Sequence, residues 1–257
     1  MSVNVKHSEV RRCTGSANLD RRELGAHSAS LGVRGLIWDI GGIDLEARVL
    51  GISQALQKLS DLHVRRVHIL LSPSEVNSVV EEAAVQAGFK RRDGETLFIR
   101  DLTAGVEPSA VVLDGYEIRN GEARDLIKIG LELQKQPELA FENWEYPLVA
   151  DCIARPQCFF KVIEHNQEIV GISIGGAFDD VGTISHTWVH PEHRWRSDSA
   201  TQPRLGRLLS AESLQALYES GARRVHLMTT LGNTSAEMFW KKQGFVVSEG
   251  GFLEIDI

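Results

Sequence analysis

The chain has 257 residues, of which 42% are hydrophobic and 25% are charged, and its formal net charge is -7. This length allows one large or two small cores, and no block of Lys or Arg lacks balancing acids, which argues against nucleic-acid or anionic-membrane partners. No apolar stretch approaches the roughly 20 residues of a spanning helix, and residues 1–12 lack an apolar signal core, so we expect a cytoplasmic protein.

The first half of the sequence alternates predicted strands and helices. Residues 1–28 are polar and non-periodic, which is typical of a mobile or loosely docked arm. Ser72-Pro73-Ser74-Glu75 has the pattern of a helix N-terminus, and Gly88 is a suitable helix end. With the spacing of apolar residues, the predicted elements are strands at 31–40, 67–71 and 97–99 and helices at 45–59 and 72–88.

The second half contains more predicted strands than helices. His165-Asn166-Gln167 separates two apolar runs and indicates a hairpin turn. Thr234 to Glu237 is a second capping box, and Gly244 ends the helix that it begins. The predicted strands are 111–118, 159–164, 168–175, 182–189, 225–229 and 252–257. The predicted helices are 122–133, 204–220 and 234–243, and 141–150 is either a helix or an ordered loop.

A pattern of strand, capped helix, Gly-Phe and strand occurs twice. Arg65-Arg66-Val67-His68-Ile69-Leu70 resembles Arg223-Arg224-Val225-His226-Leu227-Met228, and Gly-Phe follows the next helix at 88–89 and at 244–245. Because the cap and the stop recur together with the strand, we infer duplication of one α/β unit. The first copy lacks a counterpart of residues 159–190, so we expect it to be half a domain.

The segment 189–245 resembles the GNAT acetyltransferases. Val189-His190-Pro191-Glu192-His193-Arg194 is similar to the end of their fourth strand and the following turn. Leu205-Gly206-Arg207-Leu208-Leu209 is similar to the end of their pyrophosphate loop and the helix that it opens. The spacing of their fifth-strand exit and next helix is matched by Asn233, Ala236, Trp240 and Gly244-Phe245. The order and spacing together are specific, and the resemblance covers residues 111–257.

The resemblance implies an α/β (α+β) chain. We expect a GNAT fold with a mixed, mostly antiparallel sheet, preceded by a truncated GNAT-like half-domain. This two-part architecture is similar to that of the sugar-nucleotide amine acetyltransferases. The expected boundaries are a polar arm at 1–28, the half-domain at 29–105 and the acyltransferase domain at 110–257.

The resemblance also implies a thioester donor, either acyl-CoA or acyl-phosphopantetheine. In this family the fourth and fifth strands separate, and the pantetheine arm pairs with strand backbone in the gap. Amides at the next helix N-terminus bind phosphate, and Gly206 lets the backbone approach the ligand. Arginines beside the loop are suited to pair with phosphate. The expected donor-site residues are Trp188, Val189, His190, Arg194, Arg204, Leu205, Gly206, Arg207, Asn233 and Trp240.

Departures from the family pattern leave the donor open. Thr201, Arg204 and Gly206 stand where the family has a basic or amide residue and two small residues, and 195–202 lengthens the turn. Arg204 is compatible with a phosphopantetheine arm on a carrier protein, which has one phosphate and no adenosine. Trp240 stands where the family often has a tyrosine as general acid, and an indole cannot protonate a thiolate usefully. Water or another group must then protonate the leaving thiol.

Acyl transfer to an amine needs a proton acceptor and a polarised thioester carbonyl. The resemblance implies that the backbone amide of Val189 or His190 polarises the carbonyl. We favour His186 as the base, because imidazole titrates near neutral pH, with a packed strand histidine as the alternative. A strand bulge would instead let Ser185 or Thr183 face the substrate.

Other candidate residues are weaker. Glu145 and Glu142 lie in a segment that often shapes the acceptor pocket in this family. Asp179-Asp180 is most simply a turn pair, with binding of a cationic acceptor as the alternative. The cysteines are odd in number and lack metal-like spacing, so we expect reduced thiols and no metal site. They are Cys13, Cys152 and Cys158.

We therefore expect an N-acyltransferase that moves a short acyl group from acyl-CoA to a primary amine of a small polar molecule by direct attack. One alternative is a GNAT acyltransferase that takes its acyl group from an acyl carrier protein in a biosynthetic pathway. A second is an inactive GNAT-like binding protein. The oligomeric state stays open, with a homodimer as one alternative.

Overall fold

The computed structural model describes residues 27–31, 34–38, 40, 44–61, 64, 66–71, 74–91, 94–106, 115–125, 128–129, 150, 153–194 and 205–257. The chain divides into two compact units. The first contains the described residues up to Leu97 together with Ser248–Ile257, and the second contains Phe98–Val247. In the described part of the chain, no helix is long and apolar enough to cross a bilayer.

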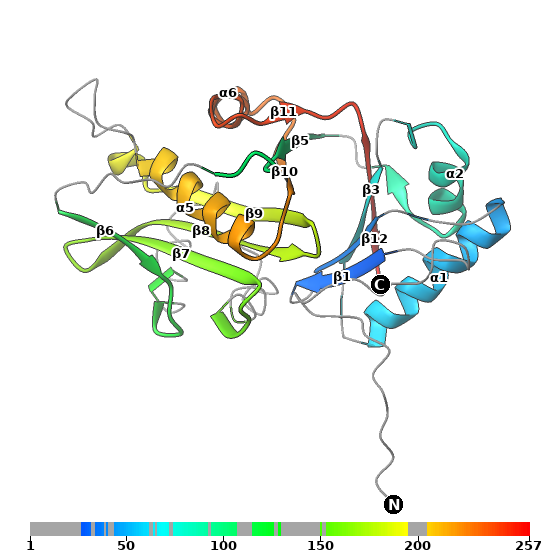
Figure 1. Ribbon diagram of the computed structural model, residues 1–257, viewed down its shortest axis with the longest axis horizontal. Helices are drawn as coiled ribbons and strands as arrows, with labels where there is room; N and C mark the ends of the chain where they lie inside the picture. Colours follow the sequence, from blue (N-terminus) through cyan, green and yellow to red (C-terminus); the bar gives the residue numbers. More distant parts are fainter. Residues whose placement is uncertain are drawn as a thin grey trace, which may run out of the picture. The chain divides into compact units, whose positions relative to one another are not determined.

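The first unit is a sheet with two helices (Figure 1). Its strand order is β1-β2-β3-β12-β4, in which β2 runs parallel to β3 and β12 is antiparallel to both of its neighbours. Apolar side chains at helical spacing on α1 pack with the buried side chains of β3 and β12. The elements are β1 (His27–Leu31), β2 (Arg34–Trp38), α1 (Leu45–Asp61), β3 (Arg66–Leu71), α2 (Val79–Gln86), β4 (Lys90–Arg91) and β12 (Gly251–Asp256).

Two predictions for this unit are wrong in detail. The predicted helix start at Ser72 is incorrect, because residues 74–77 form a turn in which Asn77 has a φ of 56°. A left-handed residue ends any helical run, so α2 begins at Val79 and is capped by the Ser78 side chain. The strand predicted at 31–40 is the end of β1 and all of β2, an antiparallel hairpin. β2 pairs in parallel with β3, as β9 (Val181–Val189) pairs in parallel with β10 (Arg224–Thr230) in the second copy. The first copy therefore has a shorter counterpart of this parallel strand pair.

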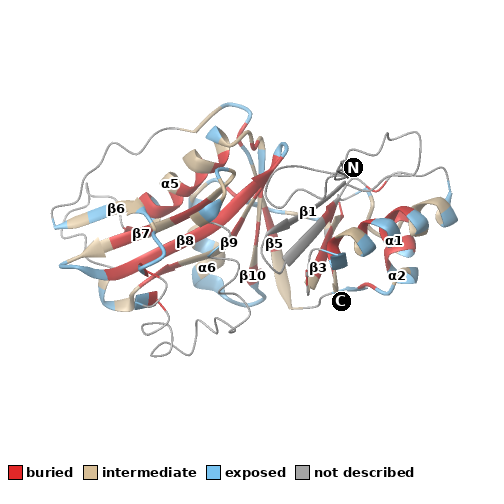
Figure 2. Ribbon diagram, turned by 90° about the horizontal axis from the view of Figure 1, so that it is seen from below, coloured by how far each residue is buried: buried red, intermediate tan, exposed pale blue. Residues whose placement is uncertain are grey.

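The second unit is built on a seven-stranded sheet with the order β11-β5-β10-β9-β8-β7-β6. Helix α5 packs across β7, β8 and β9 (Figure 1), and the inner strand β8 is buried along almost its whole length (Figure 2). A strand covered on both faces has the continuous apolar pattern seen here. The elements are β5 (Glu95–Asp101), β6 (Tyr116–Asn120), β7 (Cys158–His165), β8 (Glu168–Phe178), β9 (Val181–Val189), the 3-10 turn η3 (Pro191–His193), α5 (Leu205–Glu219), β10 (Arg224–Thr230), α6 (Thr234–Lys242) and β11 (Val246–Val247).

The two copies of the sequence repeat have exchanged their last strands. β5 follows the first copy in sequence, but it lies in the second sheet between β11 and β10. β12 follows the second copy, but it lies in the first sheet between β3 and β4. The compact units therefore differ from the expected boundary at 110–257, because residues 248–257 belong to the first unit.

The prediction of reduced cysteines is wrong for Cys158. This residue begins β7 and is disulfide-bonded, and its partner lies outside the described residues. Cysteine spacing along the chain does not reveal which thiols the fold brings together, which is why the sequence did not indicate the bond.

Candidate functional site

The strands β9 and β10 lie side by side but pair over only a short length. Their parallel rungs are Val181 with Arg224, Gly182 with Val225, and Thr183 with His226. β9 continues to Val189 and β10 to Thr230 without further rungs between them. The two strands therefore separate toward their C-terminal ends, and the edge of β9 beyond Thr183 is not covered by β10.

A bulge in β9 begins where this separation begins. Across β8, Ile174 pairs with His186 but the next residue, Gly175, pairs with Ile184, so Ser185 is the extra residue. A Cβ atom on Gly175 would lie 2.1 Å from the Thr183 carbonyl oxygen, so only glycine allows this approach. A bulge bends its strand and increases the local twist. The structure therefore contains a bulge of the kind that the sequence analysis considered, and this bulge sets which side chains of β9 share a sheet face.

The amides of Val189 and His190, which were both predicted to polarise a carbonyl, point to opposite edges of β9. The His190 amide donates to the Val170 carbonyl oxygen at 2.8 Å, so it is engaged with β8. In an antiparallel ladder, alternate amides point to opposite edges of a strand. The Val189 amide therefore points to the edge that faces β10, and Val189 remains the candidate donor.

The N-terminus of α5 lies at the open end of this gap. Leu205, Leu208 and Leu209 of α5 pack with Val189 in one apolar cluster. A Cβ atom on Gly206 would lie 3.3 Å from Phe239 Cε2 and 3.9 Å from Val189 Cγ2. The small residue thus lets the first turn of α5 approach the end of β9, and this turn contains no acidic residue. The amides of a first helical turn carry partial positive charge, which α5 directs to the open end.

Two of the predicted arginines lie near this helix end. Arg194 follows η3, and its Nε donates to the Val189 carbonyl oxygen at 2.7 Å. Arg207 is exposed on the first turn of α5. Arg204 lies outside the described residues. The structure therefore brings Val189, Arg194, Leu205, Gly206 and Arg207 together at the open end.

The two residues expected from the β10 side have structural roles. Asn233 is the N-cap of α6, and its Oδ1 accepts a hydrogen bond from the Ala236 amide at 3.1 Å. Trp240 is buried in the core of the second unit, with ring centroids 5.2 Å from Phe245. The capping box that was predicted at Thr234 thus begins one residue earlier, at Asn233.

The candidate bases lie on the sheet face away from α5. Ile184 and Val189 pack with α5, and with the bulge between them, alternation places Thr183, His186 and Trp188 on the opposite face. His186 is half-buried, and Ser185 is the bulged residue. Glu142 and Glu145 lie outside the described residues. Asp179 has a φ of 52° in the β8–β9 turn, and Asp180 accepts hydrogen bonds from the Arg223 and Arg224 amides, which supports the turn interpretation.

Sequence reasoning missed His226, which stands on the last rung between β9 and β10. Val225 and Leu227 pack with α5 side chains, so His226 lies on the same face as His186. Burial, followed by the charge of Arg224, lowers the pKa of His226 from 6.5 to about 4. The residue is therefore neutral at physiological pH. The sequence contained one indication of this residue, which is that His226 corresponds to His68 in the repeated segment.

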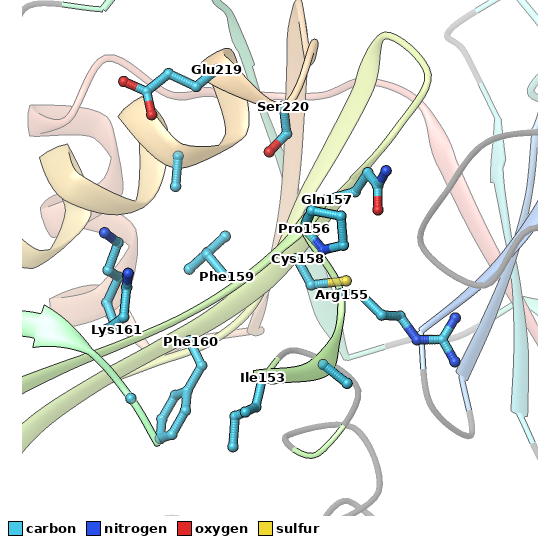
Figure 3. A pocket seen from close by; sticks show the side chains of 14 residues that line it. Ile153, Arg155, Pro156, Gln157, Cys158, Phe159, Phe160, Lys161, Glu219 and Ser220 are labelled. Atoms are coloured by element: carbon cyan, nitrogen blue, oxygen red, sulfur yellow. The ribbon is translucent and has the colours of Figure 1, made fainter. Parts of the chain in front are cut away.

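A separate cavity of about 600 Å³ lies beside the first residues of β7 (Figure 3). Side chains of α5, including Glu219, line it from one side, and Arg155, Phe160 and Lys161 line it from the β7 segment. None of the predicted donor or base residues that the structure describes lines this cavity. β8 lies between β7 and β9, so the cavity is distinct from the gap beside β9.

Comparison with protein families gives one match in the second half of the chain. Residues 124–245 match the model of the acetyltransferase (GNAT) family. This segment includes β9, the turn at η3, α5, β10 and α6. A sequence search of curated proteins gave no match.

Solved structures with the same fold cover most of the chain. A tandem GNAT protein from the clavulanic acid biosynthesis pathway has a TM-score of 0.50 and 16% identity, with 90% of this chain and 78% of that chain covered. A GCN5-related N-acetyltransferase from Kribbella flavida has a TM-score of 0.50 and 14% identity, with 91% of each chain covered. A Drosophila protein has a TM-score of 0.53 and 13% identity, with 93% and 77% covered. At these identities the likeness establishes the fold.

Proposed function

Residues 124–245 of the chain belong to the GNAT acetyltransferase family, and on this premise we propose that this acyltransferase moves a short acyl group from acyl-CoA to a primary amine of a small polar molecule. The amine attacks the thioester directly, without an acyl-enzyme intermediate. The second unit carries the reaction, because it contains the gap beside β9 and the helix end at its opening.

The observation that carries this proposal is the short pairing of β9 with β10. An extended thioester arm has amide groups, and the edge of β9 beyond Thr183 offers backbone groups in the pattern of a missing strand. The Val189 carbonyl oxygen is the exception, because it accepts a hydrogen bond from Arg194 Nε. The helix end at Gly206 and the exposed Arg207 supply the charge that phosphate groups need. One molecule that carries phosphates at one end and a thioester at the other fits both features.

The first unit provides a contrast. β2 and β3 are the counterparts of β9 and β10, and they pair over Arg34–Ile37 and Arg66–Ile69. This pairing covers all but the last residue of β2, so the described part of this strand leaves no comparable edge open. We therefore assign no thioester site to the first unit.

The transfer step needs one new bond and one proton movement from the amine. The amine nitrogen bonds to the thioester carbonyl carbon, the carbon–sulfur bond breaks, and the sulfur leaves with the bonding electrons. The amine proton passes to a base, and the leaving thiolate takes a proton from water. In this proposal the Val189 amide stabilises the negative charge that develops on the carbonyl oxygen.

For the base we retain His186, which lies on the face away from α5 beside the bulge. An amine that approaches from this face and a donor that enters beside α5 meet at β9 from opposite sides. Ser185 is the neighbouring candidate for passing the proton to water.

The direct test is thiol release from acetyl-CoA in the presence of small primary amines such as ethanolamine, putrescine and lysine. The proposal expects amine-dependent release, with the acetyl group found on the amine by mass spectrometry. A parallel arm replaces acetyl-CoA with an acetylated phosphopantetheine carrier protein. Faster thiol release from the carrier protein would identify the carrier protein as the donor in place of acetyl-CoA. No thiol release from either donor would refute the proposed function.

Two variants at one position test the role of the Val189 amide. Val189→Pro removes the amide hydrogen, whereas Val189→Ala keeps it and shortens the side chain. Loss of one oxyanion donor lowers kcat by about 10²–10³, so Val189→Pro should be much slower than Val189→Ala at similar stability. Equal kcat values for the two variants would exclude this amide from the reaction.

A further inference from the structure

The turn η3, which lies between the end of β9 and Arg194, is bonded to a strand at the edge of the sheet. His190 caps this turn, and His193 is its last residue. Tyr116 Oη, at the start of β6, lies 3.0 Å from His193 Nδ1. β8 and β7 lie between β9 and β6 in the sheet. The bond therefore ties the turn after β9 to a strand with which β9 has no backbone pairing.

A second histidine holds the Tyr116 ring in place. The ring of His165, on the opposite rung of β7, stacks on Tyr116 with centroids 4.3 Å apart. His165 Nδ1 donates a hydrogen bond to the Gly115 carbonyl oxygen at 2.7 Å, and His165 Nε2 accepts one from Asn166 Nδ2 at 3.1 Å. Both ring nitrogens of His165 are thus in use, and this ring is a fixed support for the phenol.

The bond between Tyr116 and His193 is compatible with both protonation states of the imidazole. A phenol hydroxyl donates to Nδ1 of a neutral imidazole and accepts from Nδ1 of a protonated one. The two rings also meet edge to face, with centroids 5.8 Å apart. The contact can therefore hold η3 throughout the neutral pH range in which imidazole titrates.

Arg194 is the residue that the anchored turn places. This arginine follows His193 directly and is exposed, and its Nε donates to the Val189 carbonyl oxygen at 2.7 Å. A guanidinium is planar and has five N–H donors in a fixed fork, so the bond from Nε sets the direction of the whole group. Arg194 lies at the open end with Gly206 and Arg207. A shift of η3 would therefore turn this guanidinium away from a phosphate bound there.

On the premise of the proposed function, we propose that Tyr116 and His193 are positioning residues of the donor site. Their hydrogen bond fixes η3, and η3 holds Arg194 in the direction that pairs with a phosphate group of the donor. The pair acts on the affinity for the donor and not on the transfer step. The Val189 amide belongs to β9, which β8 holds independently through the bond from the His190 amide.

The test measures the affinity for acetyl-CoA by isothermal titration calorimetry in single and double variants. Tyr116→Phe removes the hydroxyl and keeps the ring, and Tyr218→Phe, in the last turn of α5, is the matched control. We expect binding roughly 5-fold weaker for Tyr116→Phe, as for loss of one hydrogen bond, and wild-type affinity for Tyr218→Phe. In an Arg194→Gln background, Tyr116→Phe should have no further effect, because the pair acts through Arg194.

Kinetics and a second position distinguish positioning from a general loss of structure. Tyr116→Phe should raise KM for acetyl-CoA and leave kcat at saturating donor within about 2-fold of the wild type. His193→Gln, which keeps a polar partner for the hydroxyl, should bind acetyl-CoA more tightly than His193→Ala. Unchanged affinity in a folded Tyr116→Phe variant, or equal weakening in the wild-type and Arg194→Gln backgrounds, would overturn this inference alone. A wild-type protein that binds no acetyl-CoA would refute the proposed function, and the inference with it.

Discussion

Thr183 and His226 form the last rung between β9 and β10, and the bulge at Ser185 follows two residues later. The position of the bulge directly after this rung explains why the two strands separate. A bulge bends its strand and increases its twist, so a partner that runs straight loses contact. β2 pairs with β3 from the equivalent residue, and this pairing continues through Ile37, one residue before β2 ends. The open edge in the second unit is thus tied to the geometry of β9 next to Thr183.

The bulge depends on Gly175, and this gives the first prediction. In a Gly175→Ala variant, Cβ would lie 2.1 Å from the Thr183 carbonyl oxygen and 2.6 Å from Phe159 Cε1. Backbone cannot move away as a flexible side chain can, so we expect the free energy of unfolding to fall by about 3 kcal/mol. Urea denaturation followed by circular dichroism measures this change.

Gly176 is the matched control for this variant. A Cβ atom on Gly176 would lie 3.2 Å from its nearest neighbour, Cys158 Sγ, and 3.5 Å from the Gln157 carbonyl oxygen. Because these contacts are only slightly tight, Gly176→Ala should cost about 1 kcal/mol or less. Equal losses for the two variants would show that the close approach at Gly175 is not what shapes the bulge.

The exchanged strand β12 gives the second prediction. Leu253 is fully buried among side chains of the first unit, although it lies near the end of the chain. Leu253→Ala should lower the free energy of unfolding by about 3 kcal/mol, as is usual for a core leucine. Ile257→Ala, at an exposed neighbouring position, should have almost no effect. A small change in Leu253→Ala, measured by urea denaturation, would contradict the placement of β12 in this core.

The lowered pKa of the half-buried His226 leads to a dependence of stability on pH. Its pKa is lowered from 6.5 to about 4 in the folded chain. Between these values the unfolded chain binds more protons, so stability rises with pH and is lost as pH falls through this window. His226→Gln removes this proton uptake, and its loss of unfolding free energy between pH 6.5 and about pH 4.5 should be smaller by about 2 kcal/mol. Parallel pH profiles for the two proteins would show that His226 titrates normally in the folded state.

The sequence predicts much of the fold because the informative patterns are local. The helix start next to Thr234, which Asn233 caps, and the spacing of apolar residues in α5 each depend on neighbouring residues. The repeat of Arg66–Leu70 with Arg224–Met228 also corresponds to the equivalent strands β3 and β10.

The exchange of β5 and β12 could not be predicted in this way. β5 and β12 each follow a Gly-Phe pair at the same distance from the preceding helix. The sequence pattern of the two strands is therefore compatible with either sheet. The choice of partner is made by tertiary packing, which local patterns do not encode. The same limit explains the start of α2, where Ser78 was a better cap than the earlier Ser72.

The site was predicted in part for a similar reason. The turn and helix at the open end follow a recognisable motif, so Val189, Arg194 and Gly206 were identified. Asn233 and Trp240 were named from spacing, but their local roles in capping and core packing leave their part in binding untested. His226 was missed because its significance depends on the last rung of a ladder, which sequence does not show.

The central claim is that the edge of β9 and the helix end at Gly206 together bind the thioester donor. Isothermal titration calorimetry of the purified protein with acetyl-CoA tests it most directly, with Arg207→Glu and Lys58→Glu, a charge reversal on α1 of the first unit, as a matched pair. We expect saturable binding to the wild type, binding about 10-fold weaker for Arg207→Glu, and wild-type binding for Lys58→Glu. Absence of binding in the wild type, or equal weakening by both charge reversals, would contradict this site.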